Sequence, residues 1–560
     1  MRREASVVNK KVCSFPILFA LLALLIGTCA VVFPASAQAA PTSTGSITVS
    51  GTVASSYDAY QIFSANVVDG DNDAKIATDL VWASDAVRDA ALPVLHSAGM
   101  SKSQTTAQEA AEWLNTDSHL TSALSAQLAR SLQSSGAVSV ALNAGTAAEL
   151  PCGYWLIVAD DAISQNEAGT APIMALVGGS AVTVKPKAAT PKVSKHVLED
   201  STAAWQKAAD ATVADDLYWR LSATVPAGLT AYDTYAVQFV DTMSAGLDPS
   251  KVAASVRVYV AAGTDGGFDA ISAGKDGHVG TEPAKGWTDI TAQCRVSVDG
   301  KTFTVRTGDL IAALGGADAF TAGARVVAVY NAPLNSACNH GIAKGNPNEV
   351  YLRYPRSPFA DQSGDAGFTR TPSDDACAYT WDLALTKRGS DGDKPLAGAV
   401  LSIADDRGRT LAADGTWDTG GKATVTTGED GRVTVSGVDS GKLEVREPRA
   451  PKGYAAFGGT RSVTVKAEGL DVDQVAAAKP KLTITAELPL RADSADGSTG
   501  SLEASIINTP AGTLPSITTG GFMPLTGDMA MYAVAAAAVA GAAFIVVALL
   551  VKRGGGSHKE

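Results

Sequence analysis

Leu443-Glu-Val-Arg-Glu447 is the stretch that most directly indicates the fold of this chain. Side chains in a β-strand alternate between its two faces, so Leu443, Val445 and Glu447 are predicted to share one face. The flanking sequence contains other short alternating stretches, separated by turns such as Glu429-Asp-Gly431, a hairpin signal. Regularly spaced short strands of this kind are typical of a β-sandwich.

Two more strands of the same region carry a polar residue on an apolar face. Lys387 lies on the same face as Leu383 and Leu385, and Asn508 lies on the same face as Ile506. Burial disfavours the charged form of an amine or a carboxyl group. A buried neutral lysine is a nucleophile, an asparagine carboxamide is an electrophile, and a protonated glutamate can polarise the carboxamide and shuttle protons while ammonia leaves. The alternative is a surface salt bridge and a turn asparagine.

A resemblance to a known family identifies these three residues as a set. The matching stretches resemble the collagen-adhesin (Cna) B-type domain of Gram-positive pilins: Leu396–Leu401, Leu443–Tyr454 and Ile507–Pro510. The resemblance implies an intramolecular isopeptide crosslink between Lys387 and Asn508, with Glu447 as the catalytic acid.

The preceding region resembles the fimbrial D2 domain of the same pilins. This resemblance implies a crosslinking lysine at Lys195 and, with a weaker match, a catalytic acid at Asp241. The family's usual asparagine is missing, because Arg356-Ser357-Pro358 stands in its place. Either this crosslink is absent or another asparagine takes part. The matching stretches are Pro191–Lys195, Asp216–Leu221, Asp241–Leu247 and Val350–Tyr354, and the candidate asparagines are Asn335, Asn339 and Asn348.

The C-terminal end resembles the sorting signal of Gram-positive surface proteins, Leu-Pro-x-Thr-Gly. An apolar run over residues 529–551 is long enough for a transmembrane helix and is followed by a basic pair. The resemblance implies that a sortase cleaves after the threonine of the motif, which consists of Met523, Pro524, Leu525, Thr526 and Gly527. A plain membrane anchor is the alternative.

A lysine that could receive the cleaved end lies between the first two predicted domains. Residues 182–187 resemble the pilin motif, whose usual form is Tyr-Pro-Lys, and Lys187 takes the place of its polymerising lysine. Lys185 stands where the family often has an aromatic residue or a histidine. An ordinary solvated linker lysine is the alternative.

The N-terminal end predicts export. Basic residues precede an apolar stretch over residues 15–33, and small residues suited to signal peptidase follow. Export permits disulfides, and Cys152, Cys294, Cys338 and Cys377 allow three sets of pairings. Among these we predict Cys294 with Cys338, because both fall in one predicted domain. The net charge of −12 argues against a nucleic-acid partner. Cysteine and histidine spacing predicts no metal site, and no cofactor is expected.

The predicted fold is mainly β, with tandem immunoglobulin-like and Cna B-type sandwiches. The first domain has an added helical segment, in which Ser84 and Asp85 are candidate caps of one helix and Thr106 is the candidate cap of another. A Gly-rich surface loop is predicted over residues 263–286. The predicted segments are a signal peptide (1–39), an N-terminal pilin domain (40–188), a D2-like domain (189–376), a Cna B-type domain (377–510), a spacer with the sortase motif (511–527), and the transmembrane helix with its basic tail (528–560).

These features predict a structural pilin at the cell surface. Its expected partners are a sortase, neighbouring pilin subunits, peptidoglycan and a host surface ligand. The alternative is a minor pilin or a monomeric wall-anchored adhesin that binds a host or matrix ligand. An enzyme is not expected, because no Ser-His-Asp order or phosphate loop stands out.

Overall fold

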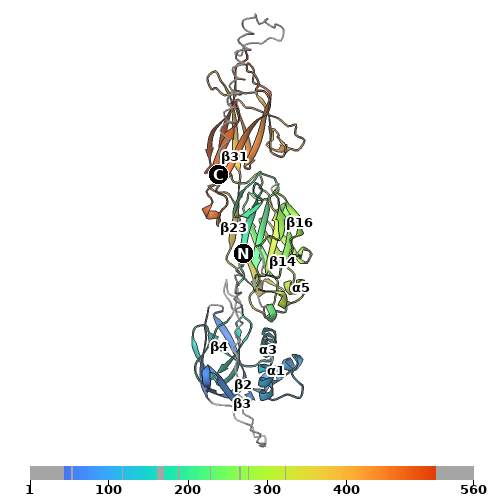
Figure 1. Cartoon of the computed structure of the whole chain (residues 1–560), viewed down its shortest axis with the longest axis vertical. Coiled ribbons are helices and arrows are strands. Elements are labelled where there is room, and N and C mark those ends of the chain that lie inside the picture. Colours follow the sequence, from blue (N-terminus) through green and yellow to red (C-terminus); the bar gives the residue numbers. More distant parts are fainter. Residues whose placement is uncertain are drawn as a thin grey trace, which may run out of the picture.

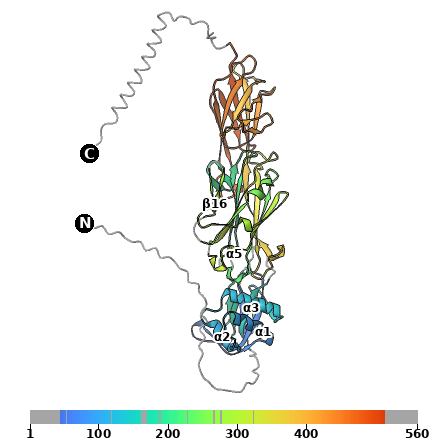
Figure 2. The ribbon, with the colours of Figure 1, turned by 90° about the vertical axis from the view of Figure 1, so that its right-hand side faces the viewer.

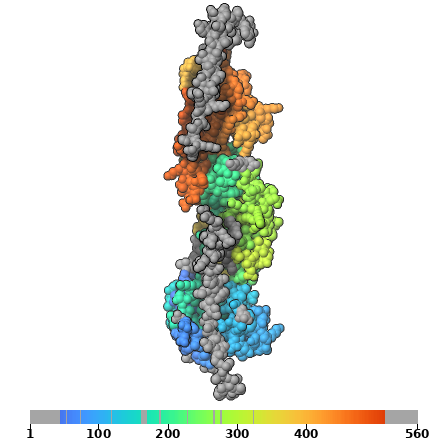
Figure 3. Space-filling view, in the orientation of Figure 1, coloured from blue at the N-terminus to red at the C-terminus, as the bar shows by residue number. Residues whose placement is uncertain are grey.

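The computed structural model describes residues 43–512, except 52–53, 117, 161–168, 187–189, 227–228, 264–266, 275–276 and 322. Three β-rich units follow one another along the long axis of the molecule (Figure 1). The second view and the space-filling view show the same row of three lobes (Figures 2 and 3). The predicted signal peptide, Lys187, the sortase motif and the apolar run after it lie outside the described residues. Within the described part, no helix is long and apolar enough to cross a bilayer.

The first unit packs two sheets against each other and helices against the outer face of one of them. Side chains alternate along β2 (Ser56–Asp69) and β6 (Gly153–Ala159): Tyr57 and Trp155 enter the core between the sheets, whereas Tyr60 and Leu156 pack under the helices. One sheet has the order β5 (Ala147–Pro151), β1 (Thr44–Val49), β8 (Val182–Val184). The other has the order β3 (Lys75–Trp82), β2 (Ser56–Asp69), β6 (Gly153–Ala159), β7 (Ile173–Val177), with β4 (Ser139–Asn143) on β2.

The predicted helical segment of this unit is confirmed, together with both caps. It forms α1 (Asp85–Ser97), α2 (Ala107–Asn115) and α3 (Ser122–Ser135). The Ser84 hydroxyl accepts a hydrogen bond from the backbone of Val87 at 3.2 Å. Thr106 and Glu109 form a reciprocal capping box at the start of α2. These caps satisfy backbone N–H groups that a helix leaves without partners in its first turn.

The second unit is a sandwich of two larger sheets around one apolar core. The first sheet has the order β10 (Ala204–Gln206), β9 (Val193–Glu199), β12 (Tyr218–Thr224), β20 (Arg325–Asn331), β14 (Arg257–Ala261), β17 (Thr288–Asp289). The second has the order β11 (Ala208–Asp210), β23 (Asp374–Tyr379), β21 (Asn346–Pro355), β13 (Gln238–Met243), β19 (Thr302–Arg306), β18 (Arg295–Asp299), with β22 (Phe368–Arg370) on β21. The short helices are α4 (Val252–Ser255) and α5 (Leu310–Ala313).

The Gly-rich stretch predicted as a surface loop is partly a hairpin. Strands β15 (Ile271–Ala273) and β16 (Val279–Pro283) pair with each other. Ala270 and Ile271 are buried against Tyr259 on the outer face of the first sheet. The sequence did not predict this hairpin, because the few apolar residues that anchor it to the sheet are spread over a stretch rich in turn signals.

The third unit is a sandwich whose first and last strands are neighbours. β24 (Trp381–Gly389) and β34 (Ser501–Asn508) run parallel and pair from Asp382 opposite Ser501 to Gly389 opposite Asn508. One sheet has the order β29 (Arg432–Val438), β24 (Trp381–Gly389), β34 (Ser501–Asn508), β33 (Leu490–Asp496). The other has the order β27 (Trp417–Asp418), β26 (Thr410–Leu411), β25 (Val400–Ala404), β30 (Gly441–Arg449), β31 (Arg461–Glu468), β32 (Lys481–Ala486), with β28 (Val425–Thr426) on β25.

The predicted disulfide between Cys294 and Cys338 is wrong for this structure, in which both cysteines are free. Cys294 comes directly before β18. The first residue of β18, Arg295, pairs with Arg306 of β19, and Arg306 pairs on its other side with Gln238, the first residue of β13. Cys294 therefore lies at the start of β13. Cys338 packs instead against Gly246, beyond the other end of β13. The six residues of β13 lie between the two cysteines, and a strand rises about 3.3 Å per residue. The Cα atoms of the two cysteines are therefore much farther apart than the roughly 7 Å that a disulfide can span. That both cysteines belong to one domain was not sufficient to predict a disulfide between them.

Candidate functional site

Lys387, Glu447 and Asn508 meet in the core of the third unit. Lys387 comes from β24 and Asn508 from the end of β34, while Glu447 reaches them from β30 in the facing sheet. The side chains of Lys387 and Glu447 are fully buried, and Asn508 is 2% exposed. The alternation of each strand sets the inward direction of its side chain, and the sandwich brings the two sheets face to face.

The three polar groups form a closed network. The Lys387 ammonium group donates a hydrogen bond to Asn508 Oδ1 and lies 3.1 Å from Glu447 Oε1. Asn508 Nδ2 donates to both carboxylate oxygens of Glu447, at 2.9 and 3.0 Å. The backbone N–H of Phe457 donates to Glu447 Oε2 at 3.0 Å. The amine therefore lies beside the carboxamide, and the acid contacts the nitrogen that would leave.

Burial favours the neutral form of Lys387, which is the nucleophilic form of an amine. It lowers the pKa of Lys387 to about 8, although the neighbouring Glu447 acts in the opposite direction. A substantial fraction of the amine is thus neutral near physiological pH, compared with a lysine in water. Geometry and protonation together permit formation of an amide between Lys387 and Asn508 with release of ammonia.

A second site of the same kind lies in the second unit. Lys195 on β9, Asp241 on β13 and Asn348 on β21 are each fully buried. The Lys195 ammonium group donates a hydrogen bond to Asp241 Oδ2. Burial lowers the pKa of Lys195 to about 8, against the effect of Asp241, and burial also raises the pKa of Asp241. Both groups are therefore shifted toward their neutral forms.

The structure brings only one of the three candidate asparagines into this site. Asn348 Nδ2 donates to the hydroxyl of Tyr330, which also accepts a hydrogen bond from Lys195, each at 2.8 Å. Asn335 instead donates to backbone carbonyls of a loop, and Asn339 donates to the carbonyl of Gly345. Sequence reasoning missed Tyr330. The available signal was a hydroxyl on the face of β20 that otherwise carries only the apolar side chains of Val326 and Ala328.

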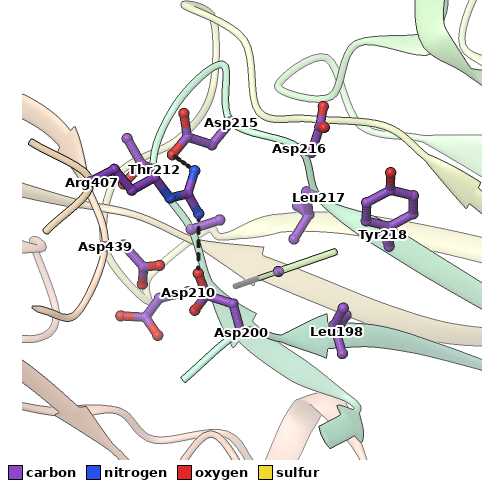
Figure 4. A pocket seen from close by; sticks show the side chains of 12 residues that line it. Leu198, Asp200, Asp210, Thr212, Asp215, Asp216, Leu217, Tyr218, Arg407 and Asp439 are labelled. Carbon is purple, nitrogen blue, oxygen red and sulfur yellow. Dashed lines mark hydrogen bonds and ion pairs between the residues drawn. The ribbon is translucent and has the colours of Figure 1, made fainter. Parts of the chain in front are cut away.

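An acidic cluster lies where the second unit meets the third (Figure 4). Arg407 extends from the third unit between Asp215, at 2.7 Å, and Asp200, at 3.7 Å. Ser440 Oγ and Trp381 Nε1, also from the third unit, donate to Asp210. Among the described residues, no group of His, Cys, Asp and Glu side chains has an arrangement that could hold a metal ion. These contacts make the cluster part of the interface between the two units.

The contact between the two units is expected to weaken as the pH rises from about 5 toward about 8. Burial, and next the charge of Asp210, raise the pKa of Glu199 from the ordinary range of a glutamate to about 8. Stability from a raised carboxyl pKa is fully present below the unfolded value and is lost as the pH rises through the folded value. The carboxyls that face Glu199 are Asp200, Asp210 and Asp439, with Arg407 as the nearby cation.

This expectation can be checked by following thermal unfolding of the whole chain from about pH 5 to about pH 8. The unfolding temperature should fall as the pH rises through this range. Glu199→Gln should flatten the decline, whereas the exposed Glu444→Gln should leave it unchanged. An equal decline in the Glu199→Gln chain would show that another group controls it.

Comparison with known proteins gives one family match and one curated relative. Residues 382–479 match the SpaA family, described as a prealbumin-like fold domain. This range contains Lys387 and Glu447 and ends before Asn508. A stretch of 143 residues is 29% identical to the trypsin-resistant surface T6 protein of Streptococcus pyogenes serotype M6. That match covers 24% of this chain and 24% of the T6 protein, so it spans only a small part of the relative.

Solved structures of pilins also align with this chain. The T6 backbone pilin of serotype M6 Streptococcus pyogenes is 17% identical, with a TM-score of 0.46, and the alignment covers 85% of this chain and 100% of that one. The major pilin SpaD of Corynebacterium diphtheriae is 15% identical, with a TM-score of 0.41 and the same two coverages. The major pilin RrgB of Streptococcus pneumoniae is 13% identical, with a TM-score of 0.36, over 66% of this chain and 85% of that one.

Proposed function

We propose that this chain is a structural pilin, the shaft subunit of a pilus that a sortase assembles on the cell surface. The observation that carries the proposal is the buried network of Lys387, Glu447 and Asn508, which joins the first and last strands of a prealbumin-like domain. In the assembly reaction, sortase cleaves after Thr526 and transfers the acyl group to Lys187 of a neighbouring subunit. The last subunit is transferred to peptidoglycan.

The crosslink in the third unit forms once, without a cofactor. The neutral amine of Lys387 attacks Cγ of Asn508, so that an Nζ–Cγ bond forms and the Cγ–Nδ2 bond breaks. The proton lost by the amine passes through the Glu447 carboxyl to Nδ2, which leaves as ammonia. Glu447 is regenerated, and the product is a neutral amide that no longer requires a buried charge.

This crosslink lies on the shortest path for a pulling force. Tension enters the third unit at β24 and leaves after Asn508, the last residue of β34. Lys387 and Asn508 lie 121 positions apart in the sequence, and a bond between them carries that tension past the intervening chain. Without it, the load falls on strand-to-strand hydrogen bonds, each worth about 1 kcal/mol net. A covalently joined shaft gains from domains that resist extension.

We also propose a crosslink between Lys195 and Asn348 in the second unit, with Asp241 as the acid. It is supported by the burial of all three side chains and by the shared contact of Lys195 and Asn348 with Tyr330. Lys195 lies on the first strand of its unit, as Lys387 does on the first strand of the third. The two units thus carry the same chemistry on different strand pairs.

Replacing the receiving lysine tests the assembly role. Full-length Lys187→Ala, expressed in sortase-competent Gram-positive cells, is expected to lose the high-mass ladder of cell-wall extracts, because the amine proposed to receive the Thr526 acyl group is missing. Lys185→Ala is the matched control, since Lys185 is an exposed lysine two positions away, and it should retain the ladder. A ladder that persists in Lys187→Ala would favour a minor pilin or a wall-anchored adhesin that binds a host ligand.

A further inference from the structure

We infer that Tyr330 is a catalytic residue of crosslink formation in the second unit, where its hydroxyl relays a proton from Asp241 to the departing amide nitrogen of Asn348. The inference rests on the proposed crosslink between Lys195 and Asn348. It assigns to Tyr330 the contact with the leaving nitrogen that Glu447 makes directly in the third unit.

The Tyr330 hydroxyl is the common partner of all three reacting groups. It accepts hydrogen bonds from Lys195 Nζ and Asn348 Nδ2, each at 2.8 Å, and donates to Asp241 Oδ2 at 3.1 Å. These contacts use both acceptor positions and the single donor of a phenol. The phenol ring is fully buried, and the ring of Phe303 packs edge-on against it, with the two ring centroids 4.6 Å apart. The hydroxyl is therefore held in place.

The two sites differ in how the acid reaches the amide. In the third unit, both oxygens of Glu447 accept hydrogen bonds from Asn508 Nδ2. In the second unit, Asn348 Nδ2 bonds to Tyr330 instead, and within the described residues Asn348 Oδ1 and Asp241 Oδ1 are buried without a hydrogen-bond partner. Aspartate is one methylene shorter than glutamate. The tyrosine hydroxyl fills the resulting gap and orients the carboxamide.

The reaction balances with these groups alone. The Lys195 amine attacks Asn348 Cγ, an Nζ–Cγ bond forms, and the Cγ–Nδ2 bond breaks. Tyr330 donates its proton to Nδ2 as ammonia leaves and takes a proton from the neutral Asp241 carboxyl. The proton released by the Lys195 nitrogen returns to Asp241. Burial of Asp241 favours the protonated carboxyl that this relay requires.

Peptide mapping of the whole chain by mass spectrometry tests the relay. The wild type should yield the branched peptide that joins Lys195 to Asn348 as soon as the protein can be isolated. Tyr330→Phe should be recovered with intact Asn348 and should form the branched peptide about 100-fold more slowly or worse, as general acid–base catalysis typically contributes that much. The branched peptide of Lys387 and Asn508 in the same sample is the internal control and should be complete.

Two further variants separate proton transfer from packing. Phe303→Leu disturbs the ring contact of Tyr330 but keeps its hydroxyl, and it should still form the crosslink. The double variant Asp241→Glu, Tyr330→Phe restores the length of the acid, and it should recover crosslinking because glutamate can reach the amide directly. Failure of this rescue, with the chain folded by circular dichroism, would overturn the relay in favour of a packing role.

Two other results distinguish failure of the Tyr330 relay from failure of the second-unit crosslink. A branched peptide that forms as fast in Tyr330→Phe as in the wild type would overturn the role of Tyr330 and leave the crosslink intact. Absence of the branched peptide from the wild type would overturn the crosslink of the second unit and the relay with it, while the shaft function and the third-unit crosslink would still stand.

Discussion

Glu447→Gln is expected to leave the whole chain one ammonia heavier than the wild type. The third-unit crosslink releases one ammonia, and glutamine cannot supply the proton transfer that the reaction needs. Because both carboxylate oxygens of Glu447 contact Asn508 Nδ2, the variant keeps the shape of the site and loses the acid. Intact-mass spectrometry measures the difference, after correction for the substitution itself.

The same variant is expected to be much less stable. In the chain-entropy account, a crosslink that closes a loop of about 100 residues stabilises a fold by about 5 kcal/mol. Lys387 and Asn508 are separated by 121 residues, so the third unit should unfold at a clearly lower temperature. In the Glu447→Gln variant the Lys387 amine also remains buried beside a neutral amide instead of a carboxylate, which lowers the stability of the third unit further.

Glu444→Gln is the matched control for both measurements. Glu444 lies on the same strand, three residues before Glu447, and its side chain is 43% exposed beside Lys442. It should keep the wild-type mass loss and unfolding temperature. If the wild-type chain retains the Asn508 amide, the proposed bond does not form, whatever the variants do.

Asn348→Ala is expected to abolish the crosslink of the second unit. The variant has no carboxamide for Lys195 to attack, so the branched peptide should disappear and one less ammonia should be lost. The bond closes a loop of roughly 150 residues, so its removal should destabilise the second unit by about 5 kcal/mol. Differential scanning calorimetry of the whole chain should show that one transition shifts while the transition of the third unit does not.

Asn335→Ala serves as the control, because the Asn335 amide donates to loop carbonyls at 3.0 Å instead of facing Lys195. It should keep the branched peptide. A peptide that joins Lys195 to Asn335 or Asn339 would show that the wrong asparagine has been assigned, and unchanged wild-type Lys195 would show that no bond forms.

The local pattern of the chain was sufficient to predict several features of the fold. Strand alternation gave the inward faces that carry Lys387, Glu447 and Lys195, and these side chains are buried. Side-chain chemistry at Ser84 and Thr106 predicted where two helices begin, and both caps are present. These features depend on neighbours only a few residues away, so a local reading of the sequence can detect them.

Strand alternation in the sequence specifies which side chains face inward, whereas the packing of the strands and sheets brings particular side chains together. Asn348 was one of three open candidates until the sandwich placed β21 opposite the strands that carry Lys195 and Tyr330. Cys294 and Cys338 share a domain but lie toward opposite ends of β13. Alternation fixes the direction of a side chain relative to its own strand, while long-range pairing of strands and sheets fixes its position relative to all the others.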